Sequence, residues 1–178
     1  AVIFLPFLPM LPVQILLNNL IYDFSQITIP IDNVDKEWIQ KPKRWIMKFI
    51  NEFMYTFGPL SSLFDIITFT VLFFVFHASA GVFQTGWFME SLATQTLVIH
   101  IIRTKGIPFV QSTAHKLLIF SSIVCLALGW MLPYTALGTY FRFEPLPLNI
   151  IFSLLLIILG YLAVVQIVKG FFYRRHDF

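Results

Sequence analysis

The chain has 178 residues, of which 58% are hydrophobic and 12% are charged. A soluble domain carries about twice that charged fraction, and the mean hydropathy is +0.81. This composition excludes an ordinary soluble domain and indicates an integral membrane protein. The formal net charge of +3 does not point to a nucleic-acid partner, because the placement of the basic residues is better explained by membrane topology.

Five apolar stretches are each long enough to cross a lipid bilayer, which takes about 20 mostly apolar residues in a helix. They occupy residues 8–29, 57–79, 83–102, 116–135 and 147–170. The apolar residues 1–7 resemble the tail of an earlier span. Ala1 is not a start methionine and no basic segment precedes the first stretch, so we expect a part of a longer protein. The predicted fold is an all-α, polytopic membrane helix bundle with five full transmembrane helices and no separate soluble domain.

Basic residues distinguish the two sides of this predicted bundle. They gather in the connections at 30–56 and 103–116 and at the C-terminus, whereas the connection at 78–84 has none and that at 135–146 has only Arg142. By the positive-inside rule, the basic connections and the C-terminus are expected in the cytoplasm. The N-terminus is then expected outside.

The predicted cytoplasmic loop 30–56 is the one sizeable polar stretch. From Trp45 onward its apolar residues recur at helical spacing, which predicts a short helix lying in the membrane interface; a solvated loop with scattered aromatic residues is the alternative. Gly58 and Pro59 are expected to break the chain before the second span.

Asn19 and Asp23 are the most informative polar residues of the first span. Four residues apart, they lie on one helical face about 6 Å from each other. An ionisable group inside a span is costly and is a candidate functional site, and amide and carboxylate oxygens suit a hard cation such as Mg²⁺. The spacing alone leaves open an interhelical hydrogen-bonded pair.

Three further polar residues inside the predicted spans are candidates for an ion path or for a structural role. Asp65 lies in the cytoplasmic third of the second span, and we favour a structural role, as partner of a neighbouring amide or serine, over a place in a cation entry path. Glu90 is expected near the external end, where its long side chain reaches interfacial water. Gln95 shares a helical face with Ser91 and Thr94, and that face is expected to look into the bundle.

Signs of catalysis are missing from the sequence. Cys125 is the one cysteine, which excludes an internal disulfide and a multi-cysteine metal site. There is no glycine-rich phosphate loop, zinc-binding histidine pair or serine nucleophile elbow. The sequence therefore predicts no catalytic residue in this chain.

The string PVQILLNNLIYD, from Pro12 to Asp23, resembles the sixth transmembrane helix of cation-pumping P-type ATPases. Within that superfamily, the rest of the chain is most similar to the bacterial magnesium-transporting P-type ATPases. The matching strings include Ile29-Pro-Ile-Asp-Asn-Val34, Phe57-Gly-Pro59, Gly86-Trp-Phe88, Ile102-Arg-Thr104 and Val168-Lys-Gly-Phe-Phe172.

This resemblance implies the last five of ten transmembrane helices of a pump in the bacterial inner membrane, with a cytoplasmic C-terminus. Asn19 and Asp23 match the sixth-helix cation ligands, and Mg²⁺ is the implied transported ion. The partner ligands on the fourth helix, and the cytoplasmic domains that bind ATP with Mg²⁺ and become phosphorylated, lie in N-terminal parts absent here, so the chain alone is expected to be inactive. Tyr22 and Phe24 replace a threonine ligand and a glycine of the calcium pumps, which argues against a second cation site.

Two other classes of function remain open at this point. One is a self-contained channel or secondary transporter that uses the same intramembrane polar residues. The other is a non-transporting membrane scaffold whose segment 30–56 docks a cytoplasmic partner. An upstream Asp-Lys-Thr-Gly-Thr sequence would decide in favour of the pump.

Overall fold

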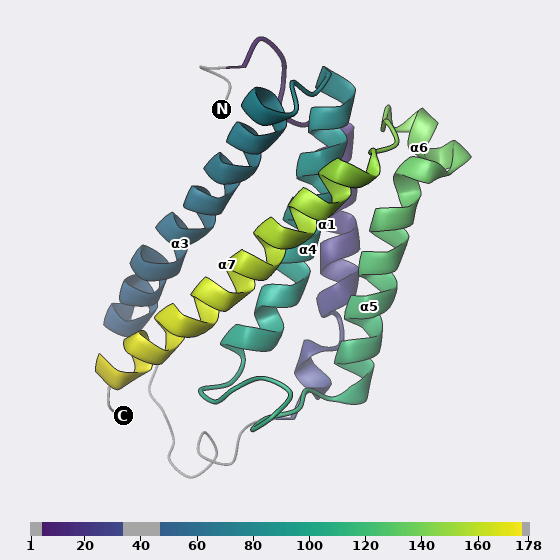
Figure 1. The fold of residues 1–178 in the computed structure, drawn as a ribbon. Helices are drawn as coiled ribbons and strands as arrows, with labels where there is room; N and C mark the ends of the chain where they lie inside the picture. Colours follow the sequence, from purple (N-terminus) through teal and green to yellow (C-terminus); the bar gives the residue numbers. More distant parts are fainter. Residues whose placement is uncertain (1–4, 34–46, 176–178) are drawn as a thin grey trace.

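The computed structural model describes residues 5–33 and 47–175 (Figure 1). Helices dominate this part of the chain, and its strand-like pairing is limited to an isolated bridge between Pro108 and Ser112. The all-α fold class is thereby confirmed. The elements are α1 (Pro12–Gln26), η1 (Ile29–Ile31), α3 (Met47–Thr70), η2 (Val71–Val75), α4 (Ala80–Ile102), α5 (Lys116–Met131), η3 (Leu132–Tyr134), α6 (Ala136–Tyr140) and α7 (Leu148–Arg175).

Helix α1 begins at Pro12, where the missing amide donor costs little. The Gln14 side chain accepts a hydrogen bond from the Leu11 amide (3.0 Å) and so satisfies a donor that would otherwise lack a partner at the helix start. At 15 residues the helix is about 22 Å long, which is less than the roughly 30 Å hydrocarbon core. The irregular residues 5–11 before it and the turn η1 after it continue the chain along the bundle (Figure 1).

The helix predicted from Trp45 onward is present from Met47, but the predictions that it is short and interfacial and that the chain breaks before the second span were wrong. Instead of an interfacial helix and a break at Gly58-Pro59, α3 runs continuously from Met47 to Thr70 with Pro59 inside it. Residues 34–46, including Trp45, lie outside the described residues.

Two features explain why α3 continues through Pro59. Ser61 and Ser62 donate to the Phe57 and Gly58 carbonyl oxygens one turn back, at 3.2 Å each. These bonds reinforce the turn that contains Pro59, but they do not replace the donor that the proline withdraws from the Tyr55 carbonyl. The aromatic rings assigned to the interface instead pack on α7: the centroids of Phe53 and Phe57 lie 5.8 and 5.9 Å from that of Phe172.

Helix α4 is the centre of the bundle, because it contacts α1, α3, α5 and α7. Three helical segments of the described chain are long and apolar enough to cross a membrane by themselves: Phe49–Val75, Lys116–Tyr134 and Leu148–Arg174. Of the other two predicted spans, α1 is too short, and α4 is less apolar although it has 23 residues. The surrounding helices shield α4 from lipid, so its polar residues can be satisfied within the protein.

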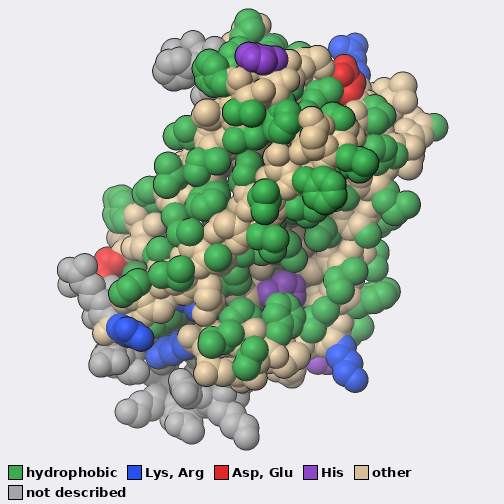
Figure 2. Space-filling view, in the orientation of Figure 1, with side chains coloured by type: hydrophobic (Ala, Val, Ile, Leu, Met, Phe, Trp, Pro, Cys, Tyr) green, Lys and Arg blue, Asp and Glu red, His purple; other side chains and the backbone are tan. Residues whose placement is uncertain are grey.

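The two ends of the bundle differ in charge, as the sequence predicted. Figure 1 places the described start and end of the 30–56 connection, the 103–115 connection and the end of α7 at one end of the bundle. In Figure 2, hydrophobic side chains cover the sides of the molecule, and Lys and Arg side chains gather at that same end. Arg142 lies at the opposite end, after α6.

Lys169 joins α7 to the end of α4. Its side chain is fully buried, and its Nζ donates to the carbonyl oxygens of Ile101 (2.9 Å) and Gly106 (2.7 Å). A cation at a helix C-terminus is stabilised by the helix dipole and by carbonyls that lack partners within the helix. Lys169 thus fixes the register of α7 against α4.

Replacing Lys169 with Met should destabilise the bundle by about 3 kcal/mol, because two buried carbonyls lose a charged donor. Thermal unfolding of the protein in detergent micelles measures this change. The matched control is Lys116→Met, since Lys116 is exposed. Equal melting temperatures for Lys169→Met and the wild-type protein would contradict the structural role of Lys169.

Candidate cation-binding site

One face of α1 is buried against α4 and the segment that follows α6. Gln14 is fully buried and donates through Nε2 to the Phe141 carbonyl (3.0 Å). Asn18 is 4% exposed and donates through Nδ2 to Ser91 Oγ (3.3 Å). Because Gln14 and Asn18 are four residues apart, they lie on one face and together fix the rotation of α1 about its axis.

Helix α5 binds the C-terminal end of α1 through hydrogen bonds. Ser121 donates to the Ser25 carbonyl (2.9 Å), and its hydroxyl lies 3.0 Å from the hydroxyl of Thr28. Both contacts involve the last turn of α1 or the residues just after it. The side of α1 that faces α4 and α5 is therefore held along its whole length.

The predicted polar face of α4 does look into the bundle. Gln95 donates to Ser91 Oγ (2.7 Å), the same hydroxyl that accepts from Asn18. Thr94 bonds back to the Glu90 carbonyl of its own helix (3.0 Å). Gln95 supports the contact between α4 and α1 in this structure.

Asn19 and Asp23 lie on the other side of α1, and both are exposed. Their neighbours on that side include Leu16, Leu20 and Phe24, each more than half exposed. Among the described residues, neither Asn19 nor Asp23 forms a hydrogen bond or ion pair; the interhelical bond that the sequence left open for Asn19 is made by Asn18. The two candidate ligands thus remain available on an otherwise apolar face.

The chemistry of this face is that of a partial cation site. Side chains four residues apart on a helix lie about 6 Å from each other, so one amide oxygen and one carboxylate can approach the same hard cation. The described residues include no group of three or more His, Cys, Asp or Glu side chains able to hold a metal. Within this part of the chain, α1 therefore offers two ligands, and further ligands have to come from water or from other polypeptide.

Asp65 forms a structural hydrogen bond, as predicted, but its partner is not the one expected. Its Oδ1 accepts a hydrogen bond from the indole Nε1 of Trp87 (3.0 Å), rather than from an amide or serine. This bond links α3 to α4.

The expectation for Glu90 was wrong, since its side chain is 2% exposed and does not reach interfacial water. The sequence placed the start of this span at residue 83, but α4 starts at Ala80. Glu90 thus lies about 15 Å along the helix, where α4 is surrounded by other helices. Its Oε2 has no hydrogen-bond partner among the described residues.

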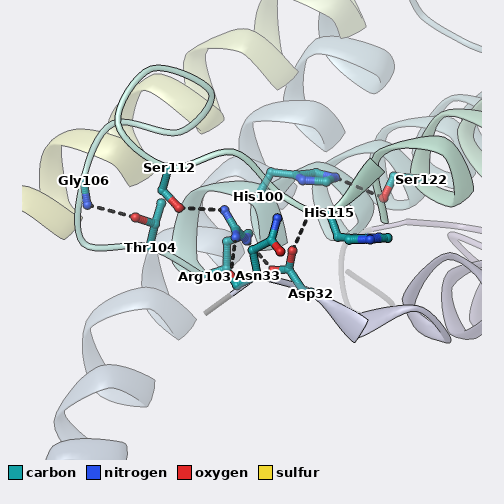
Figure 3. A network of polar contacts seen from close by, with 9 residues as sticks. All are labelled: Asp32, Asn33, His100, Arg103, Thr104, Gly106, Ser112, His115 and Ser122. Atoms are coloured by element: carbon teal, nitrogen blue, oxygen red, sulfur yellow. Dashed lines mark hydrogen bonds and ion pairs between the residues drawn. The ribbon is translucent and has the colours of Figure 1, made fainter. Parts of the chain in front are cut away.

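A polar network at the basic end of the bundle was not predicted (Figure 3). Arg103 pairs with Asp32 through Nε and donates to the Asn33 carbonyl (2.8 Å) and to Ser112 Oγ (3.2 Å). The His115 amide donates to the second carboxylate oxygen of Asp32 (2.7 Å). The sequence did contain a sign of this pair: Asp32 and Arg103 carry opposite charges and lie in connections that were predicted on the same side of the membrane.

This network holds Asp32 in its ionised form. Burial opposes ionisation, but the His115 amide and the Arg103 guanidinium outweigh it, so the pKa of Asp32 lies below its ordinary value of 3.8. The network ties the segment after α1 to both ends of the connection between α4 and α5.

Comparison with known proteins agrees with this architecture. Residues 7–171 match the family described as "Cation transporting ATPase, C-terminus". The chain belongs to this family of membrane domains.

Its relatives include proteins named "Magnesium-transporting ATPase, P-type 1". The one from Escherichia coli strain K12 is 47% identical over 177 residues, and one from Salmonella typhimurium strain 14028s shares the same identity. A protein of the same name from Salmonella typhimurium strain LT2 is 43% identical over 176 residues. Each match covers 97% of this chain but about a fifth of the relative's length.

Replacing Asp32 with Asn should change how stability depends on pH. The lowered pKa of Asp32 means that its ionised form stabilises the fold at pH values above 3.8, and that this contribution is lost as the pH falls through the lowered pKa. Thermal unfolding measured across the acid range should show a shallower loss of stability in Asp32→Asn than in the wild-type protein. Parallel curves for the two proteins would contradict the assigned role of the ion pair.

Proposed function

We propose that this chain is the C-terminal membrane domain of an ATP-driven pump that transports Mg²⁺, and that α1 supplies Asn19 and Asp23 to its intramembrane cation site. ATP hydrolysis, with its own Mg²⁺, and phosphorylation would take place in other domains of the same pump. The proposed location is the bacterial inner membrane, with the C-terminus in the cytoplasm.

The observation that carries this proposal is the difference between the two faces of α1. The face containing Gln14 and Asn18 is buried and hydrogen-bonded, while Asn19 and Asp23 are exposed on a face that is otherwise apolar. A carboxylate directed at lipid near the centre of a bilayer costs about 3 kcal/mol. A helix in the membrane keeps such a group where another protein segment or a cation compensates the cost.

The length of the relatives supports the same proposal. They carry about four fifths of their sequence outside the matched region, which leaves ample chain to cover this face of α1 and to complete the ligand set. Mg²⁺ favours oxygen ligands, commonly one or two carboxylates, and retains several waters. Asp23 would supply the charge and Asn19 a neutral oxygen, with the missing ligands on the covering segments.

The contacts that hold α1 have a mechanical consequence for such a pump. Asn18, Ser25 and Asp32 fix successive levels of the α1 segment to α4, α5 and the 103–115 connection. These contacts would keep α1 stationary while the segments that cover Asn19 and Asp23 move. Opening and closing of the cation site would then occur on the exposed side of α1.

Asp23→Asn should lower Mg²⁺-stimulated ATP hydrolysis by about tenfold or more, because loss of a charged ligand costs at least about 1.4 kcal/mol. The assay uses a chimaera in which this chain replaces the matching region of the Escherichia coli relative. Glu144→Gln is the matched control, since Glu144 is an exposed carboxylate beyond the membrane-crossing helices. Unchanged stimulation in Asp23→Asn would rule out Asp23 as a ligand.

The adjacent residues Asn18 and Asn19 provide a second test in the same chimaera. Asn18→Ala should lower the melting temperature, because the buried Asn18–Ser91 bond is lost. Asn19→Ala should leave the melting temperature unchanged and raise the Mg²⁺ concentration needed for half-maximal ATP hydrolysis. The reverse pattern would show that the rotation of α1 differs from the one described here.

A further inference from the structure

A second acidic group lies on the side of α4 that packs against α3. Asp65 on α3 accepts a hydrogen bond from Trp87 of α4 (3.0 Å), and Glu90, three residues after Trp87, lies on the same side of α4. Asp65 and Glu90 are therefore within electrostatic range of each other and of Tyr161 on α7. Ser61 bonds to the Tyr161 hydroxyl (3.0 Å). These four side chains, from three helices, form what we term the inner acid cluster.

Helical spacing shows that Glu90 points into this cluster. It follows Phe83 by seven residues, so the two side chains leave α4 in nearly the same direction. Phe83 packs against Phe69 of α3, with ring centroids 5.4 Å apart. Because α3 and α4 run in opposite directions (Figure 1), Glu90 lies deeper along the same contact, at the level of Asp65.

The hydrogen-bonding needs of this cluster are not met. Glu90 is 2% exposed, and its Oε2 has no hydrogen-bond partner among the described residues. Thr68, seven residues after Ser61 and therefore on the same stripe of α3, is fully buried, and its hydroxyl also lacks a partner in the described chain. A buried carboxylate oxygen with no donor is costly when it is ionised.

The neighbouring helices provide no opposite charge. Asp65 and Tyr161 are the titratable groups that face Glu90 from α3 and α7. On the remaining sides of α4, the inward-facing titratable groups are Cys125 of α5, which is buried, and Tyr22 of α1, which packs against the core. Asp23 of α1 and Lys116 of α5 are exposed. No Lys, Arg or His in the described part of the chain forms an ion pair with Asp65 or Glu90.

We propose that the inner acid cluster is a proton-binding site, in which Glu90 carries a proton while Asp65 accepts the Trp87 hydrogen bond as a carboxylate. Two like charges in a water-poor interior cannot both be maintained at low cost. One proton from water satisfies the pair, with the O–H of Glu90 as the bond formed. The proton returns to water when movement of α3, α4 or α7 admits solvent.

This site is separate from the cation site proposed for α1. Asn19 and Asp23 lie on the exposed face of α1, whereas Glu90 lies on the α3 side of α4. A pump with both would move Mg²⁺ through one set of ligands and exchange a proton at another.

Infrared difference spectroscopy on the purified full-length protein that contains this chain tests the proposal, by comparing acidic and alkaline buffers. The wild-type protein should show a C=O band of a protonated carboxyl group shielded from water. Glu90→Gln, which keeps the shape of the side chain, should lose that band, whereas the matched control Glu144→Gln should retain it. Persistence of the band in folded Glu90→Gln would overturn the proposal.

Two further results sharpen the test. In Asp65→Asn, the C=O band should disappear at a lower pH than in the wild-type protein, because the negative charge next to Glu90 is gone. If the pH at which the band disappears were unchanged, the proposed interaction between Asp65 and Glu90 would be contradicted. Loss of the wild-type band on adding Na⁺ or K⁺ at fixed pH would also overturn the proposal, by showing a metal-cation site. The spectrum does not depend on Asp23, so failure here is distinguishable from failure of the proposed transport function.

Discussion

The hydrogen bond between Asn18 and Ser91 is the contact on which the arrangement of the candidate site depends. Together with the Gln14 bond to the Phe141 carbonyl, it sets the rotation of α1 about its axis. A residue one position further along an α-helix points about 100° away. Burial of Asn18 against α4 therefore directs Asn19, and with it Asp23, away from the bundle.

The polarity of α4 follows from its place among the other helices. A membrane helix that carries Glu90, Gln95 and His100 could not face lipid at low cost. Surrounded by α1, α3, α5 and α7, it can satisfy these groups within the protein. Gln95 bonds Ser91 of the same helix, whose hydroxyl accepts from Asn18 of α1, and His100 lies 3.0 Å from Ser122 of α5. Several buried polar atoms of α4 still lack a partner among the described residues, namely Glu90 Oε2, Thr96 Oγ1 and His100 Nδ1. Glu90 differs from the other two because it is a carboxyl group close to a second carboxyl group, that of Asp65.

Much of this organisation could be predicted from composition and spacing. The apolar stretches located the five main helices, and the basic residues grouped the connections that share one end of the bundle. Asn19 and Asp23 could be placed on one face by their spacing, but spacing does not say whether that face is covered. Which of Asn18 and Asn19 faces the bundle could not be predicted, because the answer depends on the contact of Asn18 with Ser91 of α4, which is far away in the sequence.

The failures of prediction have local physical causes. Pro59 was expected to end a helix, but nearby serine hydroxyls and the contacts of Phe53 and Phe57 with α7 support the helix through it. Glu90 was assigned to the interface because the start of α4 was placed three residues late. The Asp32–Arg103 pair joins residues from two connections that are distant in the sequence. It could not be predicted, because it forms only when the packing of the helices brings these connections together.

The central claim is that Asp23 is a ligand of the transported cation and is covered by protein outside this chain. The most direct measurement is a structure of the full-length protein with Mn²⁺ in place of Mg²⁺, in which anomalous scattering locates the metal. The account predicts a metal peak bound by Asp23 and Asn19 and by residues from a segment that precedes this chain. A metal peak elsewhere, with Asp23 facing lipid, would contradict it.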